Sequence, residues 1–250
     1  AKKVQLEDTI DSFLSFSINK KEKITLLSLA NHTSGISEPS FDIICENTSE
    51  YPLANFDENR LISYLKKELI VEPSKKSPSY LNVGYVILGH VLEKIENKKY
   101  CELIDQYVFS KYGMCNSSLI KEEINGKVVS GIDQNGKEII TEWENITCAP
   151  AGEKLLSNVS ELSNFIIQHF NEVNKALILT RKSTVSRDEK IEIGLGWAIL
   201  KNEDNTKYHF HPGGLRGYRS CLDIDEINKT GVVILSNVSC FHKKSIAINQ

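Results

Sequence analysis

The hydrophobic period of this chain changes near residue 190, and this change limits the possible folds more than any other feature. Before it, apolar residues recur every three or four positions, which predicts helices over residues 26–31, 58–70, 82–95, 100–111 and 161–179. After it the period is two, which predicts strands over residues 194–200, 207–211, 218–224 and 231–236. Adjacent strands with short links form antiparallel sheets. We therefore expect an α/β fold, with an antiparallel sheet of about three or four strands flanked by helices and a mainly helical subdomain.

Turn and cap residues mark several expected element ends. Gly35 is expected to stop the first helix, because glycine readily adopts the left-handed conformation found there. Asn158 or Ser160 is expected to cap the helix at residues 161–179. Alternation on both sides of Asn135-Gly136 predicts a hairpin within residues 126–143. We expect one domain, with its helical part over about residues 24–180 and its sheet part over about 191–240.

Composition and charge exclude several classes of protein. The 250 residues hold 30 Lys and Arg against 33 Asp and Glu, so no basic excess is available for nucleic acid. The apolar runs are far shorter than the roughly 18–20 residues that span a bilayer. The 6 cysteines include no C-x-x-C pair, which disfavours a zinc site and leaves disulfide pairing open. We expect no cofactor, no nucleic-acid partner and no membrane span.

Three patterns resemble ligand sites, but each has a simpler explanation. Residues 131–138 fit a phosphate-binding loop until the last position, Glu138, where Ser or Thr is required. His209 and His211 fall on one face of a predicted strand and could share a metal, although one surface histidine and one functional histidine is the favoured interpretation. Residues 223–228 resemble a calcium loop only loosely, and we expect a turn there.

Ser-x-x-Lys places a nucleophilic hydroxyl and an amine base one helical turn apart. The pattern begins at Ser17, Ser63 and Ser118. None of these serines opens an apolar helix, where burial would depress the pKa of the lysine. We interpret all three as surface coincidences.

Two segments are more informative. In Tyr80-Leu81-Asn82, a phenol and an amide stand at the start of a predicted helix, where the helix dipole favours a phenolate. Taken alone, that segment is better explained by a capping asparagine beside a core tyrosine. In His211-Pro212-Gly213-Gly214, glycines between two strands would let a substrate approach backbone N–H groups, although a plain turn has the same composition.

The order of these segments resembles that of the serine β-lactamase-like family, which includes class C β-lactamases, low-molecular-weight penicillin-binding proteins (D-alanyl-D-alanine carboxypeptidases) and related esterases. The resemblance covers nearly the whole chain. Residues 3–8 resemble the segment that follows the family's first active-site helix, and residues 24–36 resemble its "LLTHTSGL" helix and turn. Residues 80–89 resemble the Tyr-x-Asn motif and its helix, and residues 150–162 the "PAG…S…DL" segment. Residues 194–197 resemble "GLGW", and residues 211–214 the His-x-Gly strand motif.

The resemblance implies a mechanism, in which a serine of Ser-x-x-Lys attacks a carbonyl and water then hydrolyses the acyl-enzyme. Tyr80 would be the proton shuttle, and Asn82 would hold the substrate amide and the lysine. His211 would take the usual Lys/His position of the third motif. Gly213 would leave room on that strand, and the Gly214 N–H would supply half of the oxyanion hole.

The chain departs from the family pattern at its start. The helix with Ser-x-x-Lys is expected upstream of Lys3, and the chain given begins at Ala1. We therefore expect the nucleophile, its lysine and the N-terminal strands of the sheet to lie outside these 250 residues, which alone would be inactive. Pro212 is a smaller departure, because it offers neither a hydroxyl nor an N–H group.

Several properties stay open on the sequence. The expected substrate is a β-lactam, a D-alanyl peptide or a small ester, so the partner is a small-molecule or peptidoglycan-like substrate. The alternative is a catalytically inactive relative that serves as a binding or regulatory module. The resemblance favours a bacterial, exported protein, although a cytoplasmic location and any oligomeric state are compatible with the sequence.

Overall fold

The structure, a computed structural model, describes residues 4–18, 22–37, 56–72, 77–133, 135–139, 147–152, 154–203, 206–215 and 217–238. Its α-helices are α1 (Leu26–Ala30), α3 (Glu58–Lys67), α4 (Asn82–Glu96), α5 (Tyr100–Ile104), α6 (Ser110–Tyr112), α7 (Val159–His169) and α8 (Lys175–Arg181). A π-helical turn, Asp105–Phe109, joins α5 to α6. Short 3-10 turns cover Ile10–Ser12, Lys121–Glu123 and Ala149–Ala151.

The main sheet has six strands, all antiparallel and ordered as they occur in the chain. They are β3 (Val185–Ser186), β4 (Ile191–Ile193), β5 (Ala198–Lys201), β6 (Lys207–Leu215), β7 (Tyr218–Asp225) and β8 (Thr230–Ser236). A separate hairpin pairs β1 (Gly131–Ile132) with β2 (Glu138–Ile139). The expected α/β class with an antiparallel sheet is confirmed, and the sheet has more strands than the period of two indicated.

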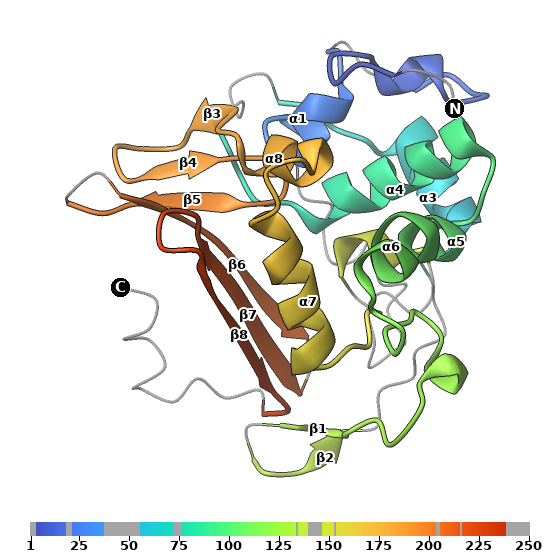
Figure 1. Cartoon of the computed structure of the whole chain (residues 1–250). Coiled ribbons are helices and arrows are strands. Elements are labelled where there is room, and N and C mark those ends of the chain that lie inside the picture. Colours follow the sequence, from blue (N-terminus) through green and yellow to red (C-terminus); the bar gives the residue numbers. More distant parts are fainter. Residues whose placement is uncertain are drawn as a thin grey trace.

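Helix α7 packs along one face of the sheet (Figure 1). Ile166 of α7 is buried with Ile224 of β7, and Val233 of β8 packs against the same cluster. Gly231 lets the helix approach, because a Cβ there would lie 2.4 Å from Ile166 Cγ2. This close contact fixes the position of the sheet relative to the helical part.

A second core joins α1, α3 and α4. Leu29, Leu61 and Ile87 are almost fully buried in it. Pro150 packs against the same helices, since a Cβ on Gly89 of α4 would lie 2.1 Å from Pro150 Cγ. Val83, at the start of α4, is buried in the same core and holds this end of the helix in place, and the candidate site lies there.

Several expected element ends are wrong for identifiable reasons. The helix expected over 161–179 is two helices, because Asn174 caps a new helix by accepting a hydrogen bond from Leu177 N. Asn158, rather than Ser160, caps α7. The first helix ends at Ala30, before Gly35, because His32 already adopts a left-handed backbone with a φ of 61°.

The strands also differ in places from the expected ones. The strand expected over 194–200 is wrong in its first half, because residues 194–197 form a tight turn between β4 and β5 in which Gly194 N donates to Trp197 O, and only residues 198–200 lie in a strand, β5. The turn expected at residues 223–228 is present, because Asp225 Oδ1 accepts hydrogen bonds from the N–H groups of Ile227 and Asn228. In the described ranges, no helix combines the length and apolar character needed to cross a bilayer.

Candidate functional site

Tyr80 lies where the helical part meets the sheet. It precedes α4, whose N-terminal cap position is Leu81, and its side chain is 62% exposed. The Tyr80 ring centroid lies 4.7 Å from that of His32 and 6.2 Å from that of His211. The alternative of a core tyrosine is therefore wrong, and two histidines flank an accessible phenol.

Asn82 is the first residue of α4 and is exposed. Leu81 occupies the cap position, so capping does not explain the asparagine. Tyr80 and Asn82 thus place a phenol and an amide at the solvent-exposed start of one helix, where the helix dipole favours negative charge.

The strand that faces Tyr80 is β6. His211, Gly213 and Gly214 all lie within it, so the expectation that they join two strands is wrong. A Cβ on Gly213 would lie 2.1 Å from Ser220 Oγ, and a Cβ on Gly214 would lie 2.8 Å from an Arg219 guanidinium nitrogen. The two glycines therefore make room for the side chains of Ser220 and Arg219 on the paired strand β7, which occupy the space that a Cβ would fill.

Both histidines beside Tyr80 are neutral at neutral pH. Burial lowers the pKa of His211 below its usual value. Burial, and then the nearby His211, lower the pKa of His32 to about 4. A phenol has a pKa near 10 and needs a nearby positive charge to act as a base, and neither imidazole supplies one at pH 7.

His32 is a site residue that residue-level sequence reasoning missed. Its backbone oxygen accepts a hydrogen bond from Ser79 N at 3.0 Å, and its Nδ1 accepts one from Leu81 N at 3.2 Å. The available signal was its place in the "LLTHTSGL"-like segment, which we interpreted only as a helix stop. A hollow beside Tyr80 is lined by His32 together with residues 34–37 and 79–81.

His209 does not join His211 in a site. Its side chain is buried, with Nε2 3.1 Å from Arg181 O and 3.3 Å from Glu226 Oε1. The interpretation of His209 as a surface residue is therefore wrong. Within the described ranges, one group of side chains has metal-ligand spacing, and neither His209 nor His211 belongs to it.

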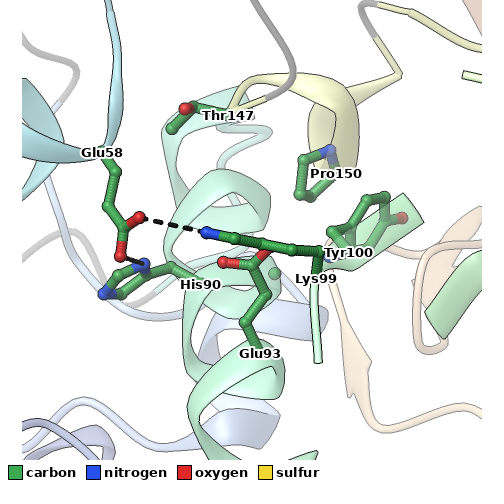
Figure 2. A pocket seen from close by; sticks show the side chains of 8 residues that line it. Glu58, His90, Glu93, Lys99, Tyr100, Thr147 and Pro150 are labelled. Atoms are coloured by element: carbon green, nitrogen blue, oxygen red, sulfur yellow. Dashed lines mark hydrogen bonds and ion pairs between the residues drawn. The ribbon is translucent and has the colours of Figure 1, made fainter. Parts of the chain in front are cut away.

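That cluster joins α3 to α4 (Figure 2). Potential ligand atoms of Glu58, His90 and Glu93 lie within 4.8 Å of one another. However, Glu58 already accepts hydrogen bonds from Lys94 Nζ at 2.8 Å and Lys99 Nζ at 3.4 Å. Two ammonium groups balance the two carboxylates and would repel a cation. We interpret the cluster as a structural network and assign no metal to it.

The described residues of the Ser-x-x-Lys patterns contact segments other than the one that holds Tyr80. In α3, Lys66 Nζ lies over the ring of Phe16, 4.8 Å from its centroid, beside the N-terminal segment. Ser118 is buried, so its interpretation as a surface residue is wrong. It forms an isolated β-bridge with Leu156, and its hydroxyl donates to a glutamate five residues on. Ser17 is exposed, and the lysine of its pattern lies outside the described residues.

Comparison with known proteins identifies the family. The chain matches the family model "Beta-lactamase" over residues 1–245. It is 24% identical to Beta-lactamase-like protein 2 of Dictyostelium discoideum over 92% of this chain, and 25% identical to Beta-lactamase-like protein 4 of the same organism over 81%. It spans only 44% and 37% of these relatives. Because both come from Dictyostelium, bacterial origin stays a prediction.

Solved structures share the fold. The octameric penicillin-binding protein homologue from Pyrococcus abyssi superposes with a TM-score of 0.76 at 23% identity, covering 98% of this chain and 59% of that one. A β-lactamase/D-alanine carboxypeptidase from Pseudomonas syringae gives 0.78 at 14% identity, covering 98% of this chain and 76% of that one. At such identities the similarity shows the fold alone.

Proposed function

Because the chain belongs to the β-lactamase family, we propose that it belongs to a serine hydrolase that works through an acyl-serine intermediate. The observation that supports this proposal is the meeting of Tyr80 with His211. The two residues come from the helical part and the sheet, and the meeting point adjoins the two glycines of β6.

In this proposal, Tyr80 passes the proton between the nucleophile and the leaving group. Asn82 hydrogen-bonds the amide of the substrate, and His211 binds its polar end. The Gly214 N–H donates to the oxyanion, and Gly213 leaves room on that strand. A single oxyanion donor is worth about 2.7–4 kcal/mol in a serine protease.

The protonation states favour a further cation at the site. His32 and His211 are both neutral at pH 7, so a basic Tyr80 needs positive charge from another group. A lysine one helical turn from the nucleophile supplies such a charge in the family mechanism. We therefore propose that the serine and its lysine lie outside residues 1–250, since the described contacts of the patterns at Ser63 and Ser118 are with residues other than Tyr80.

The proposed substrates are β-lactams, D-alanyl peptides and small esters. The test uses protein from the full reading frame, assayed with nitrocefin, a D-alanyl-D-alanine peptide and p-nitrophenyl butyrate. We expect turnover of at least one substrate and its loss in Tyr80→Phe. Binding of substrate without any turnover would contradict the enzyme and favour a binding module.

A further inference from the structure

The backbone N–H groups on both sides of Tyr80 donate hydrogen bonds to one residue, His32. Ser79 N donates to the backbone oxygen of His32 at 3.0 Å, and Leu81 N donates to its Nδ1 at 3.2 Å. The imidazole ring also contacts the Tyr80 ring, with 4.7 Å between the centroids. One histidine thus contacts the preceding amide, the phenol ring and the following amide.

The backbone of His32 is held in an uncommon conformation. Its φ is 61°, in the left-handed region that residues other than glycine seldom adopt. Asn31 fixes this turn, because its Oδ1 accepts from Thr33 N at 3.2 Å and from Thr33 Oγ1 at 2.6 Å. Such strain persists only where the surroundings impose it, and it is common at functional sites.

The hydrogen bond from Leu81 also selects one tautomer of the neutral His32 imidazole. Because Nδ1 accepts the Leu81 N–H, the ring proton of neutral His32 is on Nε2. The titratable groups facing this ring in the described ranges are Tyr80, Tyr85 and His211. Tyr85 donates to Ala30 O at 2.8 Å, so it is anchored to the end of α1.

We infer that His32 is the positioning residue of Tyr80: its carbonyl and its Nδ1 fix the two amides that flank the tyrosine, and its ring supports the phenol. This inference rests on the proposed role of Tyr80 as proton shuttle. His32 itself neither transfers a proton nor contacts the reacting atoms in this scheme. Protonation of Nδ1 would remove one of the two backbone contacts, so acid would displace Tyr80.

Two substitutions separate positioning from general stability. His32→Asn keeps a residue type that tolerates the left-handed conformation and places an amide oxygen near the position of Nδ1. His32→Ala removes the acceptor and the ring. In protein from the full reading frame, we expect His32→Ala to lower the acylation rate about tenfold or more, whereas His32→Asn recovers most of that loss.

A double-mutant cycle with Tyr80→Phe tests whether His32 acts through Tyr80. If it does, His32→Ala slows the Tyr80→Phe enzyme by less than about twofold. An equal loss in both backgrounds, or an undiminished rate in His32→Ala, would overturn the inference.

Amide hydrogen exchange of full-length protein gives a readout that needs no activity. We expect Leu81 N–H to be protected in the wild type and in His32→Asn, and to exchange faster in His32→Ala. Unchanged exchange in His32→Ala would overturn the positioning contact. Full-length protein with the expected exchange pattern but no acylation would contradict the proposed function while supporting this contact.

Discussion

The rings of Tyr80 and His211 lie 6.2 Å apart, although 130 residues separate them in the chain. Tyr80 is positioned by the start of α4, and His211 by the antiparallel pairing of β6 with β7. The meeting of the two rings therefore depends on how the helical part packs against the sheet. The packing that brings the two rings together and the chemical role of Tyr80 can be tested separately.

Removing the Tyr80 hydroxyl should slow acylation strongly. General acid–base catalysis contributes about 10²–10⁴-fold, so Tyr80→Phe in full-length protein should lower the acylation rate by a factor in that range. Stopped-flow measurement of the acylation rate checks this. The matched control is Tyr107→Phe, at an exposed tyrosine whose hydroxyl donates to Glu96 at 3.2 Å. Tyr80→Phe and Tyr107→Phe with equal rates would contradict the assignment.

Two glycines of α4 should respond oppositely to alanine. A Cβ on Gly89 would lie 2.1 Å from the rigid Pro150 ring, so Gly89→Ala should destabilise the chain by about 1–3 kcal/mol despite its better helix propensity. A Cβ on Gly84 would be 3.8 Å from its nearest neighbour, Leu29, so Gly84→Ala should stabilise by up to about 1 kcal/mol. Urea unfolding measures both, and effects of the same sign would contradict the packing of Pro150 on α4.

Mild acid should destabilise the fold before the carboxylates titrate. Burial is the largest cause that lowers the pKa of each described histidine, with His32 at about 4 and His169 at about 3. Between pH 6.5 and about 4 the unfolded chain therefore binds protons that the folded chain does not. The free energy of unfolding should fall as pH falls through this window, by up to about 1.4 kcal/mol per pH unit for a fully buried histidine.

Urea unfolding at pH 7 and pH 5 checks this sign. Above about pH 8 the same histidines are neutral in both states, so they should leave stability unchanged there. Stability that is constant or higher at pH 5 would show that the histidines are not held neutral by burial.

The sequence was sufficient where local pattern and tertiary structure agree. The apolar period predicted α4 to within one residue, because that helix is long and packs one wide face into the core. It did not separate α7 from α8, where Asn174 starts a new helix in the middle of an uninterrupted apolar pattern. The sheet was predicted in type but not in extent, because strands as short as β3 show no measurable period.

The site was predictable only in part, for a similar reason. Tyr80, Asn82 and His211 stand in segments with a recognisable order along the chain. The contribution of His32 depends on a left-handed backbone and on two hydrogen bonds to residues nearly fifty positions away. Neither property is visible in a local pattern, so a structure was needed to find it.

The central claim is that this chain belongs to an acyl-serine hydrolase whose nucleophile lies outside residues 1–250. Intact-mass analysis of full-length protein treated with a fluorescent penicillin and with a fluorophosphonate tests it most directly. We predict one covalent adduct with at least one probe, mapped by peptide sequencing to a serine of a Ser-x-x-Lys pattern upstream of Ala1, and none on the 250-residue chain alone. A full-length protein that acquires no adduct from either probe, or an adduct on Ser17, Ser63 or Ser118, would contradict the account.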